Sequence, residues 1–312
     1  MLDVISIGSC MAEITPVTPG LPLTQAHMLE MFPSGSSANF ALAAAKLGLQ
    51  VALVSRVGED ELATFVTSRL QGGGVDTSHI LATPGQFTTL SLCWADRQGK
   101  KVFYHYRFPG YSDPLCELTS ADLEDDFLTQ GKLLHFSEAC VRENKLRTVT
   151  LQIAQRCRAL GGKILYCPNY RGVWRDGEAT MQAAQQQIVV LADWVVLNEE
   201  EARVITGEPL EKAGLLLHSW GPRAVVITAG EKGSFFFSEE GVGFLPAYQV
   251  PVIYDVGAGD TFQAGFVTGL ATGLDLPEAV RFGSAAAALR ISRSGDPEML
   301  PTTAAVQQFI GQ

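Results

Sequence analysis

The stretch Gly257–Asp260, with the sequence Gly-Ala-Gly-Asp, has the residue types and spacing of a site for phosphoryl chemistry. It lies between an apolar run, 250–253, that predicts a strand and a run of small and apolar residues, 261–272, that predicts a helix. A glycine-rich turn at a helix N-terminus points several backbone N–H groups at one place, and the helix dipole adds partial positive charge there. Those N–H groups can stabilise a transferring phosphoryl group, while the Asp260 carboxylate can accept a proton from an attacking hydroxyl. The plain alternative is that Asp260 only caps the helix.

The order of the other elements predicts an α/β fold whose central sheet is mainly parallel. From residue 132 onward, short apolar runs alternate with helical ones, as in parallel strands covered by helices. Two segments, about 10–33 and 87–109, fall outside this alternation, and the second contains a β-hairpin pattern. We predict one domain over residues 1–312, with these two segments paired as a small β-sheet lid. The expected strands of the main sheet are 4–8, 51–55, 133–136, 163–166, 194–197 and 224–228, and the expected helices are 40–47, 60–70, 143–160, 178–191 and 199–206.

Composition indicates a globular protein and argues against several classes of partner. The chain has 312 residues and 46% hydrophobic composition, enough to bury a sizeable core. A formal net charge of −10 argues against nucleic acid, although local N–H groups can still hold a phosphorylated ligand. No apolar run approaches the roughly 20 residues that span a bilayer, and the N-terminus has no signal-peptide pattern. Six cysteines without C-x-x-C pairs indicate reduced thiols, so we expect a cytoplasmic protein without a membrane partner.

Four motifs occur in the order found in the PfkB, or ribokinase-like, carbohydrate kinases, which the chain resembles over nearly its whole length. Gly257–Asp260 matches the signature G-A-G-D, and Ser34–Asn39 resembles the N-terminal G-G-x-x-x-N. Asn198–Glu201 matches N-x-x-E, and Thr228–Gly233 resembles the T-x-G-x-x-G loop around the nucleotide phosphates. Each motif alone also fits an ordinary structural role. Together they predict a ribokinase-like three-layer sandwich with a mainly parallel central sheet and a small β-sheet lid.

The resemblance implies ATP and Mg²⁺ as cofactors and suggests a role for each matching residue. Asp260 is the expected general base, and the N–H groups of Gly257, Ala258 and Gly259 are the expected anion hole. Because ligands of open α/β sheets lie beyond the carboxyl ends of the strands, we expect the site residues to meet in one crevice. Glu201 suits magnesium held through water. The residues expected to bind the nucleotide and its metal are Asn198, Glu201, Thr228, Gly230 and Gly233.

One departure from the family pattern concerns a monovalent cation. The family usually carries D-T-x before G-A-G-D, and the first Asp helps to hold the cation. In this sequence Tyr254 stands at that position, and Asp255 is one residue closer to the glycines. This difference argues against potassium activation, and the requirement for a monovalent cation stays open.

The substrate end most resembles 2-keto-3-deoxygluconate kinases. Gly8–Glu13 resembles G-E-C-M-x-E, 103–107 resembles F-Y-Y-x-R, and 167–174 resembles D-x-N-x-R-x-x-W, which fructokinases share. Cys167 replaces the Asp of the last motif, and His105 replaces a Tyr of the second. Arginine can hold a substrate carboxylate through two parallel hydrogen bonds. The expected substrate-binding residues are Glu13, Gly35, Asn39, His105, Arg107, Asn169 and Arg171.

We therefore predict an ATP-dependent kinase that phosphorylates a hydroxyl of a keto sugar acid such as 2-keto-3-deoxygluconate. A fructokinase or nucleoside kinase on the same fold is one alternative. A catalytically silent sugar-binding regulator is another, although the complete G-A-G-D motif argues against silence. Exposed alternation of apolar residues over 90–94 and 102–106 predicts a homodimer through paired lids.

Overall fold

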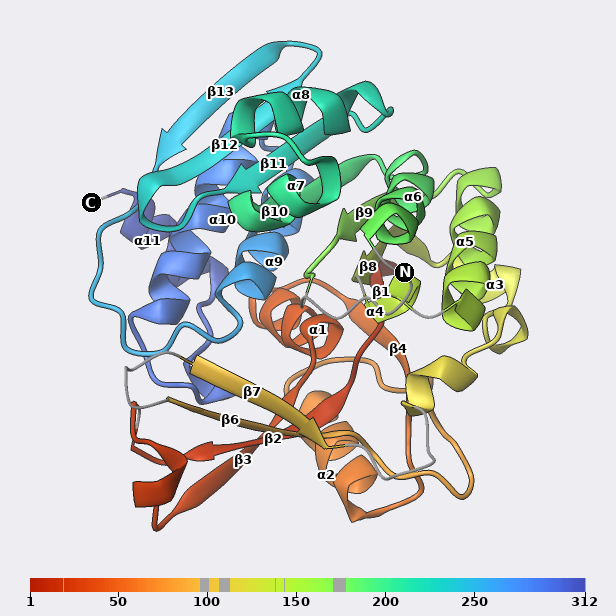
Figure 1. Cartoon of the computed structure of the whole chain (residues 1–312), viewed down its shortest axis with the longest axis vertical. Coiled ribbons are helices and arrows are strands. Elements are labelled where there is room, and N and C mark those ends of the chain that lie inside the picture. The colour runs from red at the N-terminus through yellow and green to blue at the C-terminus, as the bar shows by residue number, and fades with distance from the viewer. Residues whose placement is uncertain are drawn as a thin grey trace.

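The computed structural model describes residues 1–18, 20–95, 101–106, 113–137, 139–142, 144–170 and 178–311. In these residues a nine-stranded central sheet lies between helices on both faces, and a separate four-stranded sheet flanks it (Figure 1). The predicted α/β class with a central sheet is therefore confirmed.

The central sheet is mainly parallel, as predicted. Its strands are β1 (Leu2–Ile7), β4 (Val51–Val57), β5 (Ile80–Ala82), β8 (Gly131–Ser137), β9 (Lys163–Cys167), β10 (Trp194–Asn198), β11 (Ala224–Thr228), β12 (Gly233–Ser238) and β13 (Gly241–Pro246). They run in the order β13-β12-β11-β10-β9-β8-β1-β4-β5. All neighbours from β11 to β5 are parallel, and β12 and β13 add an antiparallel hairpin at one edge. The hairpin was not predicted.

Helices cover both faces of this sheet. The helices on one face are α1 (Ser36–Lys46), α2 (Glu61–Gly72), α9 (Ala258–Ala271), α10 (Leu276–Ile291) and α11 (Thr303–Ile310). Those on the other face are α3 (Asp125–Leu128), α4 (Ala139–Arg142), α5 (Asn144–Ala159), α6 (Glu178–Val189), α7 (Glu199–Thr206) and α8 (Leu210–Ser219). None of the helices in the described part of the chain is both long and apolar enough to cross a bilayer.

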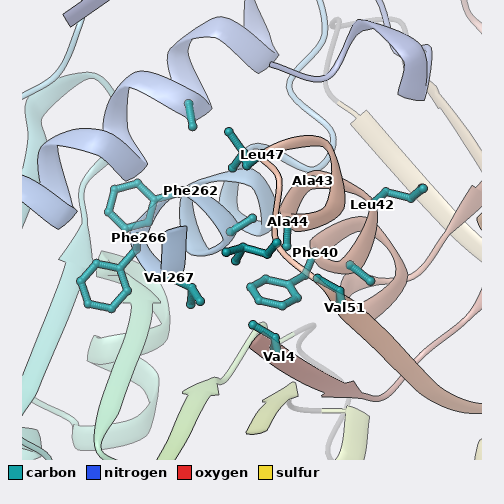
Figure 2. Close-up of a cluster of buried hydrophobic side chains, with 14 of the residues drawn as sticks. Val4, Phe40, Leu42, Ala43, Ala44, Leu47, Val51, Phe262, Phe266 and Val267 are labelled. Atoms are coloured by element: carbon teal, nitrogen blue, oxygen red, sulfur yellow. The ribbon is translucent and has the colours of Figure 1, made fainter. Parts of the chain in front are cut away.

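The alternation of side chains along each buried strand explains why both faces need a helical layer. Val4 of β1 packs into the cluster beneath α1 and α9, while its neighbour Ile5 packs into the cluster on the opposite face. Figure 2 shows the first cluster, in which Phe40 of α1 lies near Val51 of β4 and Val267 of α9. This packing fixes the N-termini of α1 and α9 relative to the strand ends.

The four-stranded sheet is formed by the two segments that the sequence sets apart. Its strands are β2 (Met11–Pro16), β3 (Leu29–Ser34), β6 (Leu90–Ala95) and β7 (Lys101–Tyr106). They run in the order β3-β2-β6-β7, and β6 and β7 form the predicted antiparallel hairpin. Figure 1 shows this sheet below the main body of the molecule. Its action as a lid, and a homodimer through it, stay predictions.

The structure corrects three predictions of element boundaries. The run 250–253 is not a strand: Pro251 has no N–H, and the N–H groups of Ile253 and Tyr254 both donate to the Ile291 carbonyl instead. The helices at the two glycine motifs also begin earlier than predicted, at Ser36 and Ala258. Both motifs therefore lie at helix starts, closer to the helix N–H groups than the sequence indicates.

Candidate active site

A cavity of about 380 Å³ lies where the carboxyl ends of the central strands, the starts of α1 and α9 and the small sheet meet. Its lining combines strand-end residues such as Asn198 and Thr228 with His105 of β7. Most residues that the sequence singles out are brought together here. The predicted site residues that line it are Glu13, Gly35, Asn39, His105, Asn169, Asn198, Glu201, Thr228, Gly257, Ala258, Gly259 and Asp260.

Two predicted site residues, Gly230 and Gly233, do not line the cavity. Gly230 lies in the turn between β11 and β12, and Gly233 is the first residue of β12. A Cβ on Gly233 would stand 2.1 Å from the Leu245 carbonyl oxygen, so close strand pairing already explains that glycine. Arg107 and Arg171 lie outside the described residues.

The turn before α9 has the geometry of an anion-binding site. Gly257 precedes the helix with φ 77°, a left-handed conformation that favours glycine. A Cβ on Gly259 would meet nothing within 4 Å, so the approach to the turn is open. The N–H of Ala258 donates to the Asp255 carbonyl at 3.3 Å, while the first N–H groups of a helix generally have no intrahelical partner. This helix start can therefore offer N–H groups to an anion in the cavity.

Asp260 lies in the first turn of α9 and is 7% exposed. Its Oδ2 accepts a hydrogen bond of 3.0 Å from the amide nitrogen of Asn39, which stands in the first turn of α1. The two glycine motifs, 221 positions apart, thus meet through these two side chains. Asn39 fixes the orientation of a carboxylate that faces the cavity beside the glycine turn.

The path of the chain into α1 explains why Gly35 is a glycine. Gly35 has φ 105°, and a Cβ there would lie 2.4 Å from the Ser9 carbonyl oxygen. Close by, the Ser36 N–H donates to the Ser9 hydroxyl at 3.1 Å. The backbones at Ser9 and Gly35 therefore lie close together, and this contact positions α1 so that Asn39 can donate to Asp260.

Glu13 is a buried carboxylate at the edge of the same cavity, on β2. The Ser34 hydroxyl donates to its Oε2 at 3.0 Å, and the Tyr254 hydroxyl donates to its Oε1 at 3.2 Å. Tyr254 therefore ties the small sheet to the loop that leads into the glycine turn. A carboxylate held in this way is suited to accept hydrogen bonds from the hydroxyls of a bound sugar.

Asn198 and Glu201 cap α7 reciprocally. The Glu201 N–H donates to Asn198 Oδ1, and the Asn198 N–H donates to Glu201 Oε2, both at 2.8 Å. The motif therefore has a structural role as a cap, and both residues still line the cavity. The described residues contain no group of three or more His, Cys, Asp or Glu able to enclose a metal ion. Mg²⁺ fits such a site, because it usually takes one or two carboxylates together with waters and substrate phosphates.

Two neutral side chains of the segment 167–174 lie near this site, and one of them, Cys167, departs from the family pattern. Cys167 is buried at the end of β9, and burial, followed by the charges of Asp260 and Glu201, raises the pKa of its thiol. It therefore stays a thiol and adds no negative charge. Asn169 lines the cavity with φ 45°, a left-handed conformation that Asn tolerates.

The sequence did not reveal all the residues at this site. Ser9, Asp113 and Gln263 also line the cavity, and the side chain of Arg290 is buried behind the glycine turn. Ser9 follows β1, so its strand-end position was a usable signal. Asp113 and Gln263 belong to no motif, and Arg290 lies in an ordinary helical run.

Known proteins share the architecture of this chain. The model of the pfkB family of carbohydrate kinases matches residues 1–303. Fructokinase-1 of Zea mays is 27% identical over 98% of this chain and 97% of its own length. The 5-dehydro-2-deoxygluconokinase of Shouchella clausii is 26% identical over 99% of this chain and 95% of its own length. The crystal structure of a PfkB protein from Polaromonas sp. JS666 is 27% identical, covers 98% of this chain and 99% of that one, and has a TM-score of 0.86.

These similarities extend over the whole chain, so they apply to the central sheet and the small sheet together. They confirm the ribokinase-like fold expected from the four motifs, and they identify the chain as an ATP-dependent carbohydrate kinase. This chain therefore belongs to the pfkB family of carbohydrate kinases.

Proposed function

We propose that this kinase transfers the γ-phosphate of ATP to a primary hydroxyl of a keto sugar acid, with Asp260 as the general base. The observation that carries the proposal is the Asp260–Asn39 pair, which stands beside the glycine turn in a cavity that Glu13 also lines. One cavity thus contains Asp260 as a proton acceptor, the start of α9, whose N–H groups can bind an anion, and the Glu13 carboxylate, which can accept hydrogen bonds from sugar hydroxyls.

Each of these groups has a defined task in the proposed reaction. Asn39 holds the Asp260 carboxylate in position to accept the proton of the attacking hydroxyl. The N–H groups of Gly257, Ala258 and Gly259 stabilise the charge on the transferring phosphoryl oxygens. Thr228 and Asn198, at neighbouring strand ends, face the phosphates. Mg²⁺ bound near Glu201 would neutralise phosphate charge.

The acid group of the substrate is the finer part of the proposal. Among the described residues that line the cavity none is Lys or Arg, whereas five are acidic: Glu13, Asp113, Glu201, Asp255 and Asp260. An anionic substrate therefore needs guanidinium partners. His105 and Asn169 line the cavity, and Arg107 and Arg171 each follow one of them by two residues in the sequence. The 5-dehydro-2-deoxygluconokinase relative, by its name, acts on a sugar acid.

Fructose is the second candidate substrate. The acidic lining suits a neutral ketose without further partners, and a fructokinase is among the relatives at 27% identity. The two candidates differ in one requirement, because fructose has no carboxylate for an arginine to bind.

The test compares kcat/KM for 2-keto-3-deoxygluconate and fructose in the wild type, Arg171→Ala and Arg107→Ala. We expect the acid to be the better substrate. Arg171→Ala should lower its kcat/KM by roughly 10- to 150-fold, about 1.5–3 kcal/mol for a hydrogen bond to a charged group, and change fructose less than threefold. Arg281→Ala, exposed on α10, is the matched control. A higher kcat/KM for fructose, or an equal loss for both substrates, refutes the sugar-acid assignment.

A further inference from the structure

The position at which the family places an acidic ligand for a monovalent cation cannot serve that purpose in this chain. Tyr254 is 9% exposed there, and its hydroxyl donates to Glu13. Burial, followed by the charge of Glu13, raises the pKa of Tyr254 well above its ordinary value. Its oxygen therefore stays protonated and neutral. The residues present at this position do not fit an alkali-metal ion.

A permanent cation of the protein lies directly beside Tyr254. Arg290 of α10 is 7% exposed, and its guanidinium carbon lies 5.1 Å from the centre of the Tyr254 ring. Its Nη1 donates to the Ser294 carbonyl at 2.8 Å and its Nη2 to the Gly295 carbonyl at 3.0 Å. These carbonyl oxygens, which would attract a metal ion, already accept from a guanidinium that keeps its proton at any ordinary pH.

The guanidinium also lies behind the glycine turn. Arg290 Nε stands 3.9 Å from the place that a Cβ on Gly257 would take. Burial lowers the pKa of Arg290, and Tyr254 together with the carboxylates of Glu13, Asp260 and Asp296 opposes this fall. The positive charge of Arg290 thus offsets the negative charge of Asp260, the proposed base, from the side of the turn opposite the cavity.

The charge of Arg290 disfavours a second cation there. Glu13, Tyr254, Gly257 and Arg290 together line one small cavity of about 30 Å³. An alkali-metal ion about 4 Å from the guanidinium would be repelled by several times the thermal energy, even at an effective dielectric constant of about 20. The positive charge of Arg290, and the two carbonyl oxygens that already accept from it, therefore exclude the ion together.

We propose that Arg290 is a built-in cation that takes the place of a monovalent metal ion behind the glycine turn, so that the kinase needs no potassium. Arg290 acts as a positioning residue: it links the loop after α10 to Tyr254 and supports the turn at Gly257. The inference rests on the proposed role of this turn as the anion hole.

The first test uses the wild-type protein. Turnover in potassium chloride and in tetramethylammonium chloride, at equal ionic strength, should differ by less than twofold, and a larger stimulation by potassium overturns the proposal. Crystals soaked in rubidium chloride give a readout without activity. No anomalous rubidium peak is expected in contact with the Gly257 turn or the Gly295 carbonyl, and a peak there overturns the proposal. This second result does not depend on which sugar is the substrate, or on whether Asp260 is the base.

Variants then separate charge from packing. Arg290→Met, which keeps most of the side-chain volume without charge, should lower kcat by about tenfold or more while the KM for ATP and for sugar changes less than threefold. Arg290→Lys should retain more of kcat than Arg290→Met. Arg293→Met is the matched control, because Arg293 is half-buried near the same helix end and donates to the Met299 carbonyl. Equal losses in the Lys and Met variants, or a rise in KM in place of the fall in kcat, contradict a role for the charge.

Discussion

Asp260 combines two properties that a general base for a sugar hydroxyl requires. It lies at a helix start among N–H groups that can hold a phosphoryl group, and Asn39 fixes one of its oxygens. The buried guanidinium of Arg290 lies on the other side of the turn, and its charge interacts with that of Asp260. The proposed proton acceptor thus has a fixed orientation beside the helix start.

Replacing Asp260 by Asn tests this role directly. Asp260→Asn keeps the shape of the side chain but loses the proton acceptor, so kcat should fall by roughly 10²- to 10⁴-fold while the affinity for ATP changes little. Steady-state kinetics and calorimetric titration with ATP measure the two effects. Asp275→Asn is the matched control, because Asp275 caps α10 far from the motifs and Asn caps a helix nearly as well. Near-normal turnover in Asp260→Asn would remove this residue from the mechanism.

At the residue scale, the sequence predicted the groups that belong to motifs and missed those that do not. Gly257–Asp260 was found because a glycine turn at a helix start is typical of anion sites, whereas Glu13 and Asn39 were found through the resemblance to the pfkB family. Arg290 was missed because its partners, the carbonyls of Ser294 and Gly295 and the ring of Tyr254, become neighbours only in the fold. The pairing of Asp260 with Asn39 likewise follows from tertiary packing, which spacing along the chain does not reveal.

At the scale of elements, the contact between α9 and α10 holds the glycine turn in place. The two backbones approach closely at a pair of glycines. A Cβ on Gly265 would lie 2.9 Å from the Gly283 Cα, and one on Gly283 would lie 2.8 Å from the Phe262 carbonyl oxygen. No side chain fits between the helices at this crossing, so the position of α9 depends on both glycines.

Gly283→Ala should therefore destabilise the protein in spite of the better helix propensity of alanine. Forcing the helices apart costs about 1–3 kcal/mol, more than the roughly 1 kcal/mol that alanine contributes in a helix. Gly72→Ala, in α2, is the matched control: a Cβ there meets nothing within 4 Å, so this change should be neutral or stabilising. Urea unfolding measures both free energies of unfolding. Equal effects in the two variants would show that the crossing tolerates a methyl group.

The elements themselves were largely predictable, with failures that have physical causes. The predicted helix 199–206 agrees with α7 at both ends, because Asn198 caps its start and Gly207 ends it. The predicted strand 224–228 agrees with β11 at both ends, because its apolar run is also the buried strand. The run 250–253 has an apolar pattern, but the N–H of Ile253 donates to the Ile291 carbonyl at the end of α10 in place of a neighbouring strand. Apolar character alone therefore did not decide its structure.

At the scale of the whole molecule, a buried histidine lies where the sheet meets α1. His135 of β8 is fully buried, its Nδ1 is 2.8 Å from the Ser6 hydroxyl of β1, and its ring stacks on Phe40 with centroids 3.9 Å apart. Burial lowers the pKa of His135 to about 3, and the side chain of Gln263 opposes this fall only in part. The native protein therefore holds this imidazole neutral, whereas the unfolded chain binds a proton there near pH 6.5.

Acid should consequently weaken the fold through His135. Between pH 6.5 and about pH 3 the unfolded state binds one more proton at this residue than the native state, so stability is full above pH 6.5 and falls as the pH decreases, by up to about 1.4 kcal/mol per pH unit. His135→Gln removes this proton and should give a shallower curve of unfolding free energy against pH, although the variant is less stable at neutral pH because it loses the stacking on Phe40. Urea unfolding from pH 7 to pH 4.5 measures the slopes, with His27→Gln, on an exposed loop, as the control for loss of a histidine. Parallel curves for the wild type and His135→Gln would mean that the buried imidazole does not make the free energy of unfolding depend on pH.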